Sequence, residues 1–193
     1  MKTDIILAVV GGQGILSIAT VIGLAAANNQ LMIKQAEVHG MSQRGGAVYS
    51  HLRLSDRPIA SDLIPAGKAD LILSVEPMEA LRYIPYLAPN GWLVTNTHPF
   101  VNIGNYPDLP SLIEQLNAVQ HRILVDADAL ALECGNIKAS NMVMLGAAVP
   151  FLKMEVHEIK KSVRSFFERK GEDVVAINLR ALQMGYDVAL QAV

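Results

Sequence analysis

Residues 5–14, Ile5-Ile6-Leu7-Ala8-Val9-Val10-Gly11-Gly12-Gln13-Gly14, decide the fold that the sequence predicts. Six apolar residues in a row, closed by glycine, are typical of a strand buried on both faces of a sheet. Apolar residues then recur at helical spacing from Ile15 to Ala26, and a second strand-like run follows at 31–36. Strand, glycine turn, helix and strand make a βαβ unit, which predicts a parallel sheet with a right-handed crossover.

The rest of the chain alternates between strand-like and helix-like segments. Strands are expected at 47–54, 70–75, 92–96 and 122–126, and helices at 77–82, 112–119, 127–133, 142–149, 156–167 and 175–189. Irregular connections are expected at 59–67 and 97–110, because prolines and a glycine lie in or directly beside each segment: Pro58, Pro65 and Gly67 for the first, and Pro99, Gly104, Pro107 and Pro110 for the second. With no repeat or linker, the sequence predicts one α/β domain over residues 1–193. This domain is expected to be a three-layer α/β/α sandwich around a mostly parallel sheet, Rossmann-like.

Composition narrows the class of protein and of partner. Hydrophobic residues make up 51% of the 193 residues and charged residues 18%, which is enough apolar material for a large core. A formal net charge of −2 gives no electrostatic reason to expect nucleic acid or an anionic membrane as partner. The first apolar run is too short for a membrane span and lacks a signal-peptide pattern, so a cytoplasmic location is expected.

The single cysteine, Cys134, limits the cofactors that the chain can bind. One thiol cannot form an internal disulfide, hold an iron–sulfur cluster or complete a four-cysteine zinc site, and Cys134 is expected to be a small buried residue. The histidines are scattered, and no metal site is expected. Asp126 and Asp128 follow a predicted strand, where capping of the next helix is favoured over binding of a cation.

Gly12, Gln13 and Gly14 form the first candidate site, because they lie where the first strand ends and the first helix begins. Backbone N–H groups at a helix N-terminus attract anions, and ligands of open parallel sheets bind beyond the carboxyl ends of the strands. A nucleotide or phosphate site is therefore one interpretation, and packing of the helix on the sheet is the other. The segment approaches the dinucleotide pattern, with Glu37 at the distance of a ribose contact, but Ser17 occupies the third small position.

The second candidate site is residues 37–46, Glu37-Val38-His39-Gly40-Met41-Ser42-Gln43-Arg44-Gly45-Gly46. Glycines allow close approach of the backbone to a ligand, and the planar charged fork of Arg44 suits a carboxylate or a phosphate. The alternative is an ordinary turn with Arg44 in solvent. No serine–histidine–acid set or carboxylate pair accompanies these residues, so the sequence predicts binding without a catalytic centre of its own.

These two segments, 11–14 and 37–46, together resemble the gamma domain of the 2-oxoacid:ferredoxin oxidoreductases. The resemblance extends to Asn178 and Gly185 in the last helix, so it covers almost the whole chain. Within the family, the compact chain is most similar to the beta subunits of indolepyruvate ferredoxin oxidoreductases. The other matching segments are Glu76-Pro77-Met78-Glu79-Ala80-Leu81-Arg82-Tyr83, Val125-Asp126-Ala127, and Gly135-Asn136 with Asn141-Met142-Val143-Met144-Leu145-Gly146.

The resemblance implies a subunit of an enzyme that oxidatively decarboxylates a 2-oxoacid to an acyl-coenzyme A and passes the electrons to ferredoxin. It implies that a large partner subunit holds thiamine diphosphate and iron–sulfur clusters and contacts ferredoxin, and that this chain alone binds no cofactor. The chain would close the partner's active site and help place coenzyme A (CoA). The implied site residues are phosphate-binding N–H donors in the first segment and contacts to cofactor or partner in the second: Gly12, Gln13 and Gly14, and Ser42, Gln43, Arg44 and Gly45.

One position departs from the family pattern. Members of the family often have glycine two residues before the Gly-Gly-Gln-Gly turn, where this chain has Val9, and a Cβ there limits how closely a ligand can approach. Two other functions therefore stay open at this point. The first is a stand-alone NAD-binding, Rossmann-like module, and the second is a non-enzymatic scaffold.

Overall fold

The computed structural model describes residues 1–39, 46–101 and 103–192. Its strands form a six-stranded sheet in the order β2-β3-β1-β4-β5-β6. β1, β4, β5 and β6 pair in parallel, whereas β3 pairs antiparallel with β1 and with β2. The strands are β1 (Lys2–Val10), β2 (Met32–His39), β3 (Ala47–Ser55), β4 (Ala69–Ser74), β5 (Leu87–Asn96) and β6 (Arg122–Val125).

The position of β3 corrects the predicted βαβ unit. β1 and β2 run in the same direction, as that unit requires, but β3 lies between them and pairs with both. Only residues 40–46 connect β2 to β3, whereas a crossover to a parallel neighbour needs a dozen residues or more. β3 therefore returns antiparallel, and the sheet is mixed, though still mostly parallel as expected.

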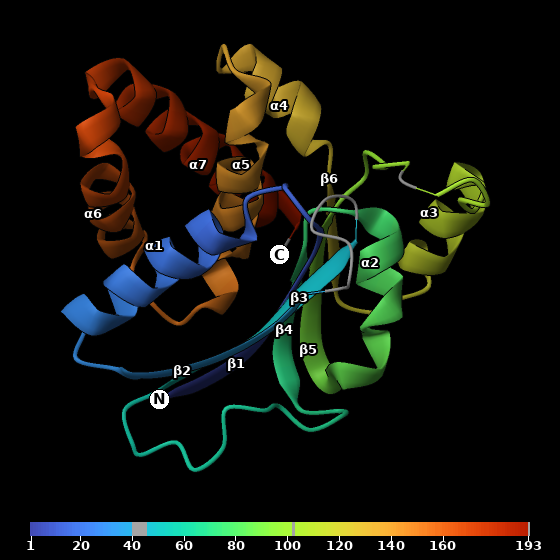
Figure 1. Cartoon of the computed structure of the whole chain (residues 1–193), viewed down its shortest axis with the longest axis horizontal. Helices are drawn as coiled ribbons and strands as arrows, with labels where there is room; N and C mark the ends of the chain where they lie inside the picture. The colour runs from blue at the N-terminus through green and yellow to red at the C-terminus, as the bar shows by residue number, and fades with distance from the viewer. Residues whose placement is uncertain (40–45, 102, 193) are drawn as a thin grey trace.

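Helices cover both faces of the sheet, which gives three layers (Figure 1). Side chains of β1 alternate between the faces: Ile5, Leu7 and Val9 enter the larger core, and Ile6 and Ala8 the smaller one. On the smaller core lie α2 (Pro77–Arg82) and α3 (Leu109–Asn117). On the larger core lie α1 (Ile15–Asn28), α4 (Ala127–Glu133), α5 (Ser140–Ala148), α6 (Val156–Phe167) and α7 (Glu172–Ala192).

Most element boundaries agree with the sequence. Pro77 is the first residue of α2, as predicted, because its missing N–H is one that a helix start leaves unbonded. β5 begins at Leu87, five residues before the predicted start at 92, because its first part passes through Pro89-Asn90-Gly91, which looks like a turn in the sequence. Short 3₁₀ turns absent from the prediction complete the chain: η1 (Ile84–Tyr86), η2 (Ile137–Ala139), η3 (Val149–Phe151) and η4 (Glu168–Lys170).

The helix α5 is buried on all sides, as its uniformly apolar sequence predicts, and it crosses α7 at backbone contact. Every residue from Asn141 to Ala148 is buried. A Cβ added to Gly146 would overlap the carbonyl of Leu182 in α7, and one added to Gly185 would overlap the carbonyl of Val143 in α5. Two glycines, one on each helix, therefore fix how closely these helices approach.

We predict that Gly185→Ala lowers the free energy of unfolding by about 1–3 kcal/mol, because the added methyl group must push two buried helices apart. Gly23→Ala is the matched control, since a Cβ at Gly23 in α1 meets nothing within 4 Å. That control should gain up to about 1 kcal/mol from helix propensity. Urea unfolding measures both, and equal behaviour of the two variants would contradict the packing role of Gly185.

Candidate ligand-binding site

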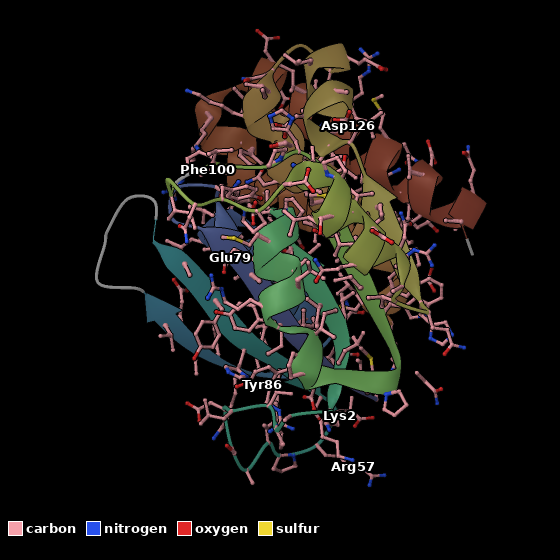
Figure 2. All side chains as sticks on the ribbon, turned by 90° about the vertical axis from the view of Figure 1, so that its right-hand side faces the viewer. Lys2, Arg57, Glu79, Tyr86, Phe100 and Asp126 are labelled. Atoms are coloured by element: carbon pink, nitrogen blue, oxygen red, sulfur yellow. The ribbon has the colours of Figure 1, made fainter. Side chains whose placement is uncertain are left out.

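The candidate site lies where β1 and β4 end. These strands are adjacent and parallel, but the helix after β1 covers the larger core and the helix after β4 covers the smaller one. This is a topological switch point, where a doubly wound sheet opens a crevice beyond its strands. In Figure 2, Phe100 and Asp126 lie at this end of the molecule, opposite Lys2 and Arg57.

A cavity of about 480 Å³, here called the turn cavity, occupies this crevice. Gly12, Gln13 and Gly14 line one side and Val75, directly after β4, lines the sheet side. Lys138 of η2, and Ser140 and Asn141 at the start of α5, also line it. The N-termini of α1 and α5 thus face one cavity, a volume in the range of small-molecule sites.

Hydrogen bonds fix the glycine turn and join it to the second candidate segment. The N–H of Gly11 donates to the carbonyl of Gly46 at 2.8 Å, so the end of segment 37–46 meets the turn as a site would require. The Gln13 side-chain carbonyl accepts from the Val10 N–H at 2.8 Å, and the Gln13 N–H donates to the Val10 carbonyl at 3.2 Å. The backbone N–H of Gln13 is therefore already bonded, so the N–H groups expected to bind an anion are those of Gly12 and Gly14.

Gly12 and Gly14 have positive φ angles, 104° and 85°, but their surroundings differ. Among the described residues, none would lie within 4 Å of a Cβ on Gly12, so none of them covers this glycine. A Cβ on Gly14 would come within 2.5 Å of the Asn141 amide nitrogen. Gly12 thus suits contact with a ligand, while Gly14, the N-cap residue of α1, also lets α5 pack against the turn. Helix packing, one of the two roles left open by the sequence, is therefore present at Gly14, and a ligand contact at Gly12 stays a prediction.

Val9 does not obstruct the turn cavity. Its side chain is 1% exposed and packs in the larger core, and its backbone pairs with Val48 of β3. The Cβ of Val9 therefore points into the sheet–helix interface, and its departure from the family glycine leaves the cavity open.

Residues beyond β5 and β6 form the far wall. Asn96 accepts from the Ala127 N–H at 3.1 Å and donates to Asp128 at 3.3 Å, which fixes the start of α4 beside the cavity. Asp126 caps α4 by accepting from the Ala129 N–H at 3.0 Å, as the sequence predicts. Asp128 lines the turn cavity and lies 3.8 Å from His98. In the described ranges, no three His, Cys, Asp or Glu residues are grouped to hold a metal ion.

A buried carboxylate holds the connection between β5 and α3 over the site. Glu76 is fully buried and caps α2 by accepting from the Glu79 N–H at 2.8 Å. It also accepts from the hydroxyl of Tyr106 and from the N–H of Phe100 at 3.4 Å. Burial and this bond to Glu76 raise the pKa of Tyr106, which keeps its hydroxyl a donor. Phe100, 45% exposed, is thereby placed on the rim of the turn cavity.

Sequence reasoning missed several lining residues. Lys138 lies on the short turn η2 and Phe100 on the connection after β5, and no sequence pattern singles them out. A signal was available for Asn141, because it is a polar residue at the start of an otherwise apolar helix. Ser42, Gln43, Arg44 and Gly45 lie outside the described residues, so their contacts stay predictions.

Glu37 does not occupy the place of a ribose-binding acid in a dinucleotide fold. It pairs with Ser50 of β3, and Ser50 pairs in turn with Leu7 of β1. β3 therefore separates Glu37 from the strand that carries the turn, whereas the acid of the dinucleotide fold follows a strand adjacent to it. The side chain of Glu37 accepts from Gln35 at 3.2 Å. This topology disfavours the NAD-binding alternative.

Two other candidate groups are structural. Cys134 is buried, as predicted, with its sulfur 3.2 Å from that of Met184, and burial raises the pKa of its thiol. A raised pKa disfavours the thiolate that a nucleophile requires. His51 is buried and accepts from the Ile64 N–H at 3.1 Å, and burial lowers its pKa. Among the described helices, none is long and apolar enough to cross a membrane.

Comparisons with known proteins agree with this geometry. Residues 4–188 match the family model described as pyruvate ferredoxin/flavodoxin oxidoreductase. The chain is 36% identical to the indolepyruvate oxidoreductase subunit IorB of Archaeoglobus fulgidus, over 98% of this chain and 96% of that one.

Solved structures share the fold. The gamma subunit of a keto/oxoacid ferredoxin oxidoreductase from Geobacter sulfurreducens has a TM-score of 0.74 at 24% identity, covering 98% of this chain and 99% of that one. The 2-oxoglutarate:ferredoxin oxidoreductase of Magnetococcus marinus, solved with 2-oxoglutarate, coenzyme A and succinyl-CoA, has a TM-score of 0.78 at 22% identity. All of this chain matches 31% of that longer one. With the family match over almost its whole length, the chain belongs to the pyruvate ferredoxin/flavodoxin oxidoreductase family.

Proposed function

We propose that the chain is a non-autonomous subunit of an indolepyruvate-type 2-oxoacid:ferredoxin oxidoreductase, which it helps by placing CoA at the active site of a partner subunit. The observation that carries this proposal is the 36% identity to an indolepyruvate oxidoreductase subunit over nearly the full length of both chains. The turn cavity supports it, because it is a ligand-sized space at the switch point with two helix N-termini facing it.

The proposed division of labour gives the carbon and electron chemistry to the partner. Thiamine diphosphate supplies the electron sink for decarboxylation of the 2-oxoacid, and iron–sulfur clusters pass the electrons to ferredoxin. A chain with one cysteine cannot supply the thiolates that hold such clusters. We therefore assign both cofactors, and the contact with ferredoxin, to the large subunit.

This chain then contributes binding and orientation. Backbone N–H groups of Gly12 and Gly14, together with the positive end of the α1 dipole, would hold the pyrophosphate of CoA. Phe100 and Ile137, on the rim of the cavity, would shield the uncharged arm of CoA. This arm ends in the thiol and would lead toward the partner. Positioning of this kind lowers the barrier of thiol transfer by removing translational and rotational freedom.

We also propose that one half of the sheet, β1-β4-β5-β6, is Rossmann-like. The order β1-β4-β5-β6 is the order of the corresponding half of the doubly wound nucleotide-binding fold, with its switch point beside β1. β2 and β3 follow a different order. The nucleotide portion of CoA would use the first half, and segment 37–46 would connect the second half to the site.

The proposed function is tested by purifying the chain with the large thiamine-diphosphate subunit from the same source. The expected result is a stable complex that reduces a viologen dye only with both indolepyruvate and CoA present, while neither chain does so alone. Failure of the chains to associate, with no activity in the mixture, would overturn the proposal.

In this complex, Gly12→Ala should raise the KM for CoA about tenfold and leave the KM for indolepyruvate unchanged. The added methyl group would enter the open space over the turn, and losing one charge-assisted hydrogen bond costs about 1.5–3 kcal/mol. Gly67→Ala is the matched control, because Gly67 also has a positive φ and open space, but lies before β4 at the opposite edge. Both variants should lose about 1–2 kcal/mol of stability. An equal effect of both variants on CoA would remove Gly12 from the site.

Arg44→Ala should lower turnover of the complex at least about tenfold, because a permanent charge that meets an anion or the partner is lost. The melting temperature of the isolated chain should stay within about 2 °C, because the proposal assigns Arg44 to contacts with the cofactor or the partner and not to the folding of this chain. Arg57→Ala, an exposed arginine at the opposite end of the molecule, is the control (Figure 2). A large loss of thermal stability with Arg44→Ala would identify a structural arginine instead.

A further inference from the structure

A second cavity lies beside the turn cavity and shares two residues with it. This space of about 270 Å³, here called the lysine pocket, is lined in part by Ser17 of α1, Lys138 of η2, Lys170 of η4 and Asn178 of α7. Lys138 and Asn141 line both cavities. The two spaces are therefore neighbours along the first turn of α1, from Gly12–Gly14 at one end to Ser17 at the other.

The charges that line the two cavities differ. The turn cavity includes one carboxylate, Asp128, and one lysine. The lysine pocket includes two lysines, and no carboxylate lines it among the described residues. Of the acids near Lys170, Glu172 is exposed and pairs with Arg164 at 2.9 Å, and Asp173 is exposed and does not line the pocket. The lysine pocket thus favours an anionic group.

Neither lysine is committed to another partner within the described chain. No ion pair or side-chain hydrogen bond of Lys138 is present there, although its backbone N–H donates to Asn136 at 3.0 Å. The Lys170 ammonium group lies 5.3 Å from the ring centre of Phe167, a cation–π contact that orients the side chain without neutralising it. Both lysines are exposed, so their ammonium groups are accessible to a ligand.

Asn141, at the junction of the cavities, has unmet hydrogen-bonding capacity. It is 8% exposed, and its Oδ1 has no hydrogen-bond donor among the described residues. A buried polar atom left without a partner costs about 1–3 kcal/mol. A polar ligand that extends from one cavity into the other would pass this amide, and a hydroxyl or N–H group of the ligand would donate to the unpaired Oδ1.

We propose that the two cavities form one cleft for a ligand with phosphate groups at two places, and that Lys138 and Lys170 hold the 3′-phosphate of CoA. This inference rests on the proposed function and adds a specificity determinant to it. The pyrophosphate lies at the glycine turn, and the 3′-phosphate, carried on the ribose, lies in the lysine pocket. The pocket therefore distinguishes CoA from its analogue without that phosphate.

The test compares CoA with dephospho-CoA, which lacks only the 3′-phosphate, in the reconstituted complex. The wild type should have a KM for CoA about tenfold below that for dephospho-CoA. Lys138→Gln and Lys170→Gln should each raise the KM for CoA several-fold, and the double variant should raise it about tenfold. None of these three variants should change the KM for dephospho-CoA. Lys161→Gln is the control, because Lys161 is an exposed lysine paired with Glu158 on α6 and lies outside both cavities.

The outcomes separate this inference from the proposed function. If the lysine variants weaken CoA and dephospho-CoA equally, or change neither, the assignment of the 3′-phosphate is wrong, while CoA-dependent turnover still supports the proposed function. If the wild-type complex turns over indolepyruvate without any requirement for CoA, the proposed function fails and the inference fails with it. If the double variant loses the preference for CoA over dephospho-CoA and its melting temperature is unchanged, the result supports the lysine pocket.

Discussion

The placement of α5 is the constraint on which the rest of the structure depends. This helix is buried on all sides, so it packs through its whole circumference and not through one apolar stripe, and part of that packing is backbone against backbone. It meets α7 where Gly146 and Gly185 remove both side chains from the crossing, and its first turn meets Gly14 through Asn141. Because interiors are packed as densely as crystals of small molecules, these contacts fix α5 within narrow limits. A shift of α5 would displace one wall of the turn cavity.

This constraint explains why the site combines elements that are far apart in the sequence. The turn follows the first strand, whereas Lys138 lies just before α5 and Asn141 in its first turn. They come together because α1 and α5 pack side by side on the larger core, beyond the ends of β1 and β4. On the other side, the buried carboxylate of Glu76 joins the start of α2 to Tyr106 and Phe100. Both walls are thus held by buried contacts, and the opening between them faces the carboxyl edge of the sheet.

Much of the fold followed from the sequence because its periodicity is strong. The buried first strand, the helix begun by Pro77, the cap at Asp126 and the all-apolar α5 were each predicted from local patterns with a physical cause. The insertion of β3 was not predicted, since strand order depends on which strands pair across the sheet. The length of the 40–46 connection was nevertheless a usable signal, because so few residues exclude a parallel crossover.

The candidate site was less predictable than the fold. The turn was predicted because a glycine-rich strand end before a helix has a general physical meaning. The structure shows packing against α5 at Gly14, whereas a ligand contact at Gly12 stays a prediction. Lys138 and Phe100 were not found, since nothing local marks a residue on an irregular segment that tertiary structure brings to a cavity. The expected obstruction of the site by the Cβ of Val9 depended on which face of β1 the side chain occupies. The side chain lies on the face that packs in the larger core, so it does not enter the turn cavity.

The surface around the turn cavity fits a site that another subunit completes. Phe100 and Ile137 on its rim are 45% and 48% exposed, and exposed large apolar side chains beside a cavity are typical of surfaces that become buried on association. A net charge of −2 also conceals how the chain would attract a phosphate. In the proposed site the attraction would come from oriented backbone dipoles at two helix N-termini and from two lysines with no carboxylate among the described residues that line their pocket, and composition reports neither. A nearly neutral protein can therefore offer a polyanion site whose specificity depends on where its few charges are placed.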